Sequence, residues 1–301
     1  MSGLEIGRIA LPTGVTLAVQ TGGPEDGEPI VLLHGFPESH RTWREVAPAL
    51  ARDFRVIAPD QRGFGASDKP EGVEAYRTDR ILEDLIALAD ALGLARFTLV
   101  GHDWGGAVAW LAALKHPDRL SRLVIVNAPH PLVFQKSLFE DPAQRAASQY
   151  IDAFRNPAME QGIAAMGLET FFAKSFGGHA DVSKLSDAER QAYLDDWGRP
   201  GALTAMLNWY RASEIVVPGV GEEARAPLWT MAPFPAIEVP TLVLWAMRDT
   251  ALLPVQLDGL DELVDELRIV TIPEAGHFVP WEQPKPIVAA IRDFMHDTRE
   301  G

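Results

Sequence analysis

The chain has 301 residues, of which 47% are hydrophobic and 23% are charged, a balance typical of a folded globular protein. Its 27 Lys and Arg stand against 42 Asp and Glu, and the net charge of −15 argues against nucleic acid or an anionic membrane as a partner. There is no Cys, which excludes disulfides, thiolate metal sites and cysteine nucleophiles. No apolar run approaches the roughly 20 residues that span a bilayer, and the N-terminus lacks a signal-peptide pattern, so we expect a soluble, cytoplasmic protein.

Strand and helix signals alternate through the first 130 residues. Short apolar runs bounded by turn residues predict strands, and apolar residues at helical spacing predict the helices between them. This alternation predicts a mostly parallel sheet covered by helices on both faces. The predicted strands are 7–11, 15–20, 29–33, 54–58, 96–100 and 120–126, and the predicted helices are 41–51, 78–92 and 105–115.

The pattern changes after residue 130. Residues 131–235 are rich in aromatic side chains and predict helices without a buried strand. Strand signals return at 241–245 and 268–272, and a helix is expected at 286–296. The acidic run 261–266 between them lacks calcium-loop spacing and is expected to be a solvated helix face. The sequence therefore predicts an α/β core from residues 1–130 and 236–301, with residues 131–235 inserted as a helical cap.

The segment Val100-Gly101-His102-Asp103-Trp104-Gly105-Gly106 lies between a predicted strand and a predicted helix. This is the context of a nucleophile elbow, a sharp turn that small residues permit and that lifts the central side chain above the sheet. The candidate nucleophile is Asp103. An ordinary tight turn is the alternative interpretation of this segment alone.

Candidate partners for Asp103 follow in the later strands. Asp249 lies in the loop after the strand 241–245, and His277 follows the strand 268–272. Nucleophile, acid and histidine are the chain order of an α/β-hydrolase. The loop after the strand 29–33 can supply the backbone N–H of Phe36 to an oxyanion hole, and Trp104, the residue after the nucleophile, can supply the second. His34 and His102 are expected to have structural roles.

An aspartate nucleophile restricts the chemistry. A carboxylate needs no base to become nucleophilic, but it is a good leaving group and is poorly suited to acyl transfer. It suits displacement at a saturated carbon, which forms an alkyl ester of Asp103. His277, oriented by Asp249, would then activate the water that hydrolyses this ester. Epoxides and alkyl halides are the two substrate classes that fit.

Four motifs carry a resemblance to a known family: HGFPES at 34–39, PDQRGFGAS at 59–67, GHDWGG at 101–106 and LNWYR at 207–211. They resemble the soluble epoxide hydrolases of the α/β-hydrolase superfamily, nearly end to end in the core and more thinly in the cap. The resemblance implies two cap tyrosines that donate to the epoxide oxygen. Tyr210, in LNWYR, matches one of them, and Tyr150 matches the other; packing within the cap is the alternative role for both.

The resemblance implies conversion of a small apolar epoxide and water to a vicinal diol, with no metal or organic cofactor. A haloalkane or haloacetate dehalogenase that uses the same three residues is the alternative. Fluoroacetate dehalogenases resemble this chain at HGFP and in keeping a cap tyrosine, but they carry Arg after the nucleophile, where this chain has Trp104. A ligand-binding module without activity is a further alternative, although all three members of the triad are present.

Overall fold

The computed structural model describes residues 3–297, which fold around one eight-stranded sheet with the strand order β1-β2-β4-β3-β5-β6-β7-β8. The pairs β1–β2 and β2–β4 are antiparallel and all other pairs are parallel. This confirms the predicted fold class. The strands are β1 (Glu5–Ala10), β2 (Thr16–Gly22), β3 (Pro29–Leu33), β4 (Arg55–Pro59), β5 (Phe97–His102), β6 (Leu120–Val126), β7 (Thr241–Ala246) and β8 (Leu267–Ile272).

Alternating side chains of the central strands separate two apolar cores. Ile30 and Leu32 of β3 point to one face, where they pack with α1 (Val46–Leu50) and α12 (Pro284–Asp297). Val31 and Leu33 point to the other face, where α2 (Thr78–Ala91) and α3 (Trp104–Lys115) cover the sheet. Because both faces of the parallel strands are buried, these strands are apolar throughout rather than alternating with polar residues.

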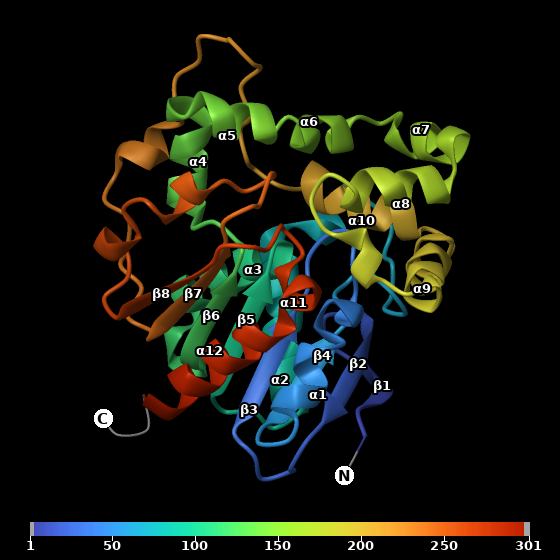
Figure 1. The fold of residues 1–301 in the computed structure, drawn as a ribbon, viewed down its shortest axis with the longest axis vertical. Helices are drawn as coiled ribbons and strands as arrows, with labels where there is room; N and C mark the ends of the chain where they lie inside the picture. Colours follow the sequence, from blue (N-terminus) through green and yellow to red (C-terminus); the bar gives the residue numbers. More distant parts are fainter. Residues whose placement is uncertain (1–2, 298–301) are drawn as a thin grey trace.

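A helical layer lies above the carboxyl ends of the strands and is inserted between β6 and β7 (Figure 1). An isolated bridge pairs Ile237 with Val264, but the described residues between β6 and β7 form no named strand. We propose residues 131–235 as the bounds of this cap. Its helices are α4 (Pro131–Glu140), α5 (Pro142–Ala147), α6 (Tyr150–Arg155), α7 (Met159–Met166), α8 (Leu168–Phe176), α9 (Asp187–Trp197) and α10 (Ala202–Arg211).

The single helix predicted over residues 41–51 is wrong. The chain instead forms a short 3₁₀ helix, η1 (His40–Trp43), followed by α1 (Val46–Leu50). Pro48 lies in the first turn of α1, and its missing N–H prevents a helical hydrogen bond to Arg44. A continuous helix through this position is therefore broken.

The acidic run 261–266 also differs from its prediction. It contains the end of the 3₁₀ helix η7 (Leu260–Glu262) and an irregular segment before β8, not an α-helix, although its four acidic side chains are exposed.

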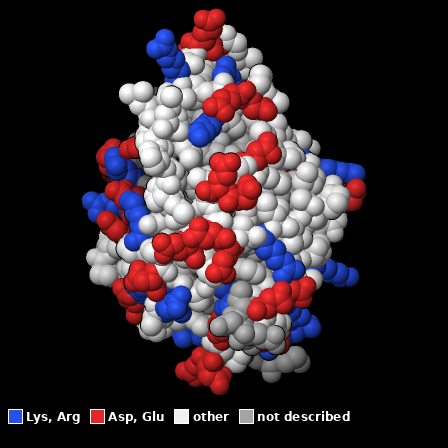
Figure 2. Space-filling view, turned by 90° about the vertical axis from the view of Figure 1, so that its left-hand side faces the viewer, with Lys and Arg blue, Asp and Glu red and all other residues white. Residues whose placement is uncertain are grey.

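Acidic side chains gather along the middle of the face that lies on the left of Figure 1, with basic side chains mostly nearer its margins (Figure 2). None of the helices between residues 3 and 297 combines the length and the apolar character needed to cross a membrane.

Candidate active site

Asp103 lies at the turn between β5 and α3 in a backbone conformation that few residues other than Gly adopt, with φ 51° and ψ −123°. The surrounding glycines make the turn possible. A Cβ at Gly101 would overlap the backbone of Gly105, and a Cβ at Gly105 would overlap the backbone of Leu33. The strand and the helix therefore approach closely, and the Asp103 side chain projects from the sheet into the space beneath the cap.

The loop after β3 contacts the Asp103 carboxylate directly. The backbone N–H of Phe36 donates to Asp103 Oδ1 at 2.7 Å, and the backbone N–H of Trp104 helps to lower the pKa of this carboxyl. Gly35 lies against the same side chain, so that a Cβ at position 35 would overlap it. The two residues predicted for an oxyanion hole thus both present N–H groups to Asp103.

His277 lies between the two carboxylates. Its Nδ1 is 2.7 Å from Asp249 Oδ2, and its Nε2 is 3.6 Å from Asp103 Oδ2. An ionised carboxylate only accepts, so Nδ1 donates its proton to Asp249. The longer distance exceeds a hydrogen bond, and His277 and Asp103 interact there as charges. Side chains from three distant parts of the chain therefore contact one another in the order Asp249, His277, Asp103.

Asp249 is held by the loop that follows it and by β6. Its Oδ1 accepts from the backbone N–H groups of Ala251 and Leu252 at 2.8 and 2.9 Å. Its Oδ2 accepts from the Asn127 side chain at 2.8 Å, and Asn127 Oδ1 in turn accepts from the backbone N–H of Ala246. Asn127 was not among the residues predicted from the sequence. Its position directly after β6, beside the end of β7, was the signal that could have identified it.

Burial and charge act in opposite directions on the three residues. Burial alone would lower the pKa of His277, but the carboxylates of Asp249 and Asp103 outweigh it and hold this pKa well above its usual value. Burial alone would raise the pKa of the Asp103 carboxyl, and contact with His277 keeps it below its usual value instead. The same balance lowers the pKa of Asp249. The resting site is therefore a buried imidazolium between two carboxylates.

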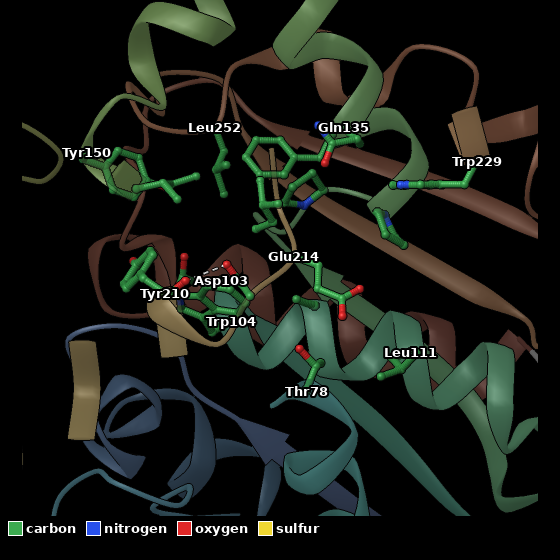
Figure 3. Close-up of a pocket in the computed structure, with 17 residues that line it drawn as sticks. Thr78, Asp103, Trp104, Leu111, Gln135, Tyr150, Tyr210, Glu214, Trp229 and Leu252 are labelled. Carbon is green, nitrogen blue, oxygen red and sulfur yellow. Dashed lines mark hydrogen bonds between the residues drawn. The ribbon is translucent and has the colours of Figure 1, made fainter. Parts of the chain in front are cut away.

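Two tyrosines of the cap face the nucleophile. Tyr150 begins α6 and Tyr210 lies near the end of α10, and their ring centroids are 6.0 Å apart. Both lie on the same side of the cavity as Asp103 and Trp104, with Trp229 across from them (Figure 3). Burial, followed by neighbouring groups that include the Asp103 charge, raises the pKa of both phenols. Both hydroxyls therefore stay protonated at neutral pH and are available as donors.

The space around these groups is divided into two cavities that share Asp103, Tyr150 and Tyr210. One has a volume of about 350 Å³ and extends along α3 and α4 toward Trp229. The other has a volume of about 280 Å³ and extends past His277 beneath α7 and α8. The walls of both are predominantly apolar side chains. An apolar molecule with a polar centre fits this arrangement.

The two histidines predicted to be structural connect loops around the site. His34 Nε2 accepts from the backbone N–H of Gln61, and its Nδ1 is 2.9 Å from the Gly35 carbonyl oxygen. His102 Nε2 is 2.8 Å from the carbonyl oxygen of His277. Burial lowers the pKa of each imidazole to about 4. Both rings are therefore neutral and act through hydrogen bonds.

The described part of the chain, residues 3–297, contains no group of three or more His, Cys, Asp or Glu side chains arranged to hold a metal ion. The polar groups that line the two cavities include the Asp103 carboxylate, the His277 imidazole and the two phenols. A carboxylate can act as a nucleophile, an imidazole as a base and a phenol as a proton donor. They can carry out displacement followed by hydrolysis.

Comparison with known families agrees with the fold. Residues 28–284 match the family described as alpha/beta hydrolase fold. The chain is 35% identical over 283 residues to the AB hydrolase superfamily protein YfhM of Bacillus subtilis, covering 94% of this chain and 95% of that protein. The chain belongs to the α/β-hydrolase family.

Within that family, the similarity to epoxide hydrolases is confirmed. Epoxide hydrolase A of Mycobacterium tuberculosis is 32% identical over an alignment of 322 positions, which covers 96% of each chain. A solved structure described as one of the "novel epoxide hydrolases belonging to the alpha/beta hydrolases superfamily in metagenomes from hot environments" is 46% identical. It superposes with a TM-score of 0.90 over 97% of this chain and 99% of that one.

Proposed function

We propose that this protein hydrolyses epoxides to vicinal diols through a covalent alkyl ester on Asp103. The observation that carries the proposal is the position of two protonated phenols, Tyr150 and Tyr210, on the same cavity as a carboxylate backed by His277 and Asp249. The epoxide hydrolases among the relatives support the same reaction class. The substrate is a small apolar epoxide, and water is the second reactant.

In the first step, an Asp103 carboxylate oxygen attacks one carbon of the epoxide ring and the bond from that carbon to the ring oxygen breaks. The low pKa of Asp103 keeps the attacking group ionised without a base. The ring oxygen takes a proton from Tyr150 or Tyr210 as its charge develops, because an alkoxide is a poor leaving group. The products are a hydroxyalkyl ester of Asp103 and a phenolate.

In the second step, water attacks the carbonyl carbon of the Asp103 ester and gives a proton to His277. The N–H groups of Phe36 and Trp104 are positioned to stabilise the oxyanion that forms. The ester bond to the diol then breaks, the leaving oxygen takes the remaining proton of the former water, and the Asp103 carboxylate returns beside the His277 imidazolium of the resting site. Water and epoxide are thus converted to diol with nothing else consumed.

Alkylation prepares His277 for this second step. In the resting site the Asp103 charge helps to keep the His277 pKa high, which favours the imidazolium. Esterification removes that charge, so the His277 pKa falls and the imidazolium gives its proton to the phenolate through the product or solvent. The neutral imidazole is then available as a base. Asp249 continues to orient the ring and stabilises the imidazolium that forms.

The test is to separate the two steps by substitution. His277→Gln is expected to open an aryl epoxide once and then stop, so intact-protein mass spectrometry should detect one substrate mass per chain on the peptide that contains Asp103. Asp103→Asn is the matched control and should carry no adduct, with slow deamidation monitored by mass. A folded His277→Gln protein that binds ligand but gains no adduct would refute the two-step scheme and favour direct activation of water against the epoxide.

A substrate panel distinguishes the dehalogenase alternative. Epoxides, haloalkanes and haloacetates are compared by diol formation and halide release, and the proposal expects diol formation to be faster. Neither step as written requires a metal or an organic cofactor, so full activity is also expected in excess EDTA. Faster halide release across the panel would move the assignment to the dehalogenases.

A further inference from the structure

A buried glutamine of the cap holds the loop that carries Asp249. Gln144 lies on α5 and is fully buried. Its Nε2 donates to the carbonyl oxygen of Ala251 at 2.9 Å and to Ser148 Oγ at 2.9 Å, and its Oε1 accepts from the backbone N–H of Leu253 at 2.8 Å. The amide group thus bonds to the backbone on both sides of Leu252, as a neighbouring β-strand would.

The backbone that Gln144 holds is the backbone that holds the acid. Ala251 and Leu252 supply the two N–H groups that donate to Asp249 Oδ1. Residues 250–253 belong to no helix or strand, so no regular hydrogen-bond ladder keeps these N–H groups in place. The contacts therefore form a continuous path from Gln144 through this loop to Asp249 and on to His277 Nδ1.

We propose that Gln144 is a positioning residue for hydrolysis of the alkyl ester, and that it acts by holding Asp249 against His277. This inference rests on the two-step function proposed above. The nucleophile does not depend on the same contacts, because Phe36 and Trp104 hold Asp103 from a different loop and a different helix. Loss of the Gln144 amide should therefore slow the second step and spare the first.

A second glutamine provides a matched control. Gln256 of η6 (Pro254–Leu257) is also fully buried and also joins the cap to the core, because its Nε2 donates to Ser137 Oγ of α4 at 2.7 Å. Its side chain lines neither of the two cavities and does not bond to Asp249, Ala251 or Leu252. Gln256→Met therefore removes a buried amide between cap and core without removing the bonds that hold the acid loop.

The experiment measures both steps in single turnover with an aryl epoxide, by acid quench and intact-protein mass spectrometry. Gln144→Met should gain the adduct at nearly the wild-type rate and lose it roughly 10- to 100-fold more slowly, the scale of effect that a small misplacement of a catalytic group produces. In Gln256→Met the ratio of the two rate constants should stay as in the wild type. Adduct formation at the normal rate also shows that the Gln144 variant is folded.

The pH profile of ester hydrolysis separates positioning from simple loss of structure. Asp249 raises the pKa of His277, so an Asp249 that has moved away leaves a lower pKa on the imidazole. The acidic limb of the hydrolysis rate should therefore shift to lower pH in Gln144→Met. A weakened fold would lower the amount of active enzyme and leave the midpoint of this limb unchanged.

Two outcomes would overturn the inference: ester hydrolysis at the wild-type rate in Gln144→Met, or an equal change in the rate ratio for Gln256→Met. If Gln144→Met does not fold, Gln144→Glu keeps an acceptor for the Leu253 N–H, loses the donor to Ala251, and is judged by the same measurements. Failure of the proposed function has a different signature, because His277→Gln would then also show no adduct.

Discussion

Gly35 packs directly against Asp103: a methyl group at position 35 would come within 3 Å of the Asp103 carboxylate, closer than real Cβ atoms approach other atoms. The next residue, Phe36, donates its backbone N–H to the same carboxylate. Gly35 is therefore needed for the approach of this N–H to the nucleophile, and not for an unusual backbone angle, since it is absent from the residues with positive φ.

Gly35→Ala should displace the Asp103 carboxylate and slow formation of the alkyl ester about 10²-fold, the scale that a 1 Å misplacement of a reacting group produces. Single-turnover adduct formation measures this directly. Gly162→Ala is the control, because a Cβ at this position of α7 meets no atom within 4 Å. Adduct formation at the wild-type rate in Gly35→Ala would show that the loop accommodates the methyl group without displacing Asp103.

Local patterns predicted the core of this fold well. The strand before Asp103, the helix after it and the glycines between them lie in one short segment, so the turn could be derived from neighbouring residues. The acid and the histidine could be ordered along the chain because each follows a strand of the same parallel sheet. The break at Pro48 was also local, and it was missed because the apolar spacing across it remained helical.

Contacts between distant segments could not be predicted in the same way. Asn127 and Asp249 are 122 residues apart in the chain, and Gln144 and Ala251 are 107 apart. Each pair is brought together by the order of strands or by the packing of the cap on the core, which hydrophobic periodicity does not specify. The residues that support Asp249 were therefore identified only in the folded structure.

Removal of the tyrosine hydroxyls should affect ring opening. Tyr210→Phe or Tyr150→Phe alone is expected to slow adduct formation by up to about 10²-fold, and the double variant should lose far more, because each phenol partly substitutes for the other. Tyr76→Phe is a control, since its buried hydroxyl donates to the carbonyl oxygen of Pro70 away from the cavities. A double variant with nearly normal turnover would exclude this role for the pair.

Asn127→Gly should weaken the support of Asp249 from β6. Gly accepts the positive φ of 42° at this position, so the change removes the side chain without adding backbone strain. We expect slower ester hydrolysis and a loss of about 1–3 kcal/mol in unfolding free energy, from a buried hydrogen bond to a charged group. Denaturant unfolding and single-turnover decay of the adduct measure the two effects. Unchanged values for both would mean that the Ala251 and Leu252 N–H groups hold Asp249 unaided.

The charge on His277 should make stability depend on pH in a defined direction. Its pKa in the folded protein is raised well above the usual 6.5, mainly because Asp249 and Asp103 outweigh the effect of burial. A raised pKa contributes stability that is fully present below about pH 6.5 and is lost as the pH rises through the folded pKa. In Asp249→Asn the imidazole loses its closest carboxylate, so less charge opposes the effect of burial on the His277 pKa. The stability that the raised pKa contributes therefore becomes smaller. The unfolding free energy of the wild type should therefore exceed that of the variant by the largest amount at mildly acidic pH.

The difference in unfolding free energy between the wild type and Asp249→Asn should then become smaller as the pH rises above 6.5, by up to about 1.4 kcal/mol per pH unit for one proton. Denaturant unfolding of both proteins between pH 5.5 and about 9 measures it, and His277→Gln, which has no titrating group at this position, controls for other ionisations. Both carboxylates have lowered pKa values, so their own contributions are lost only as the pH falls below about 4, outside this window. A difference that stayed constant or widened with pH would show that His277 is neutral in the resting protein, and the activation of His277 by alkylation of Asp103 would then have to be abandoned.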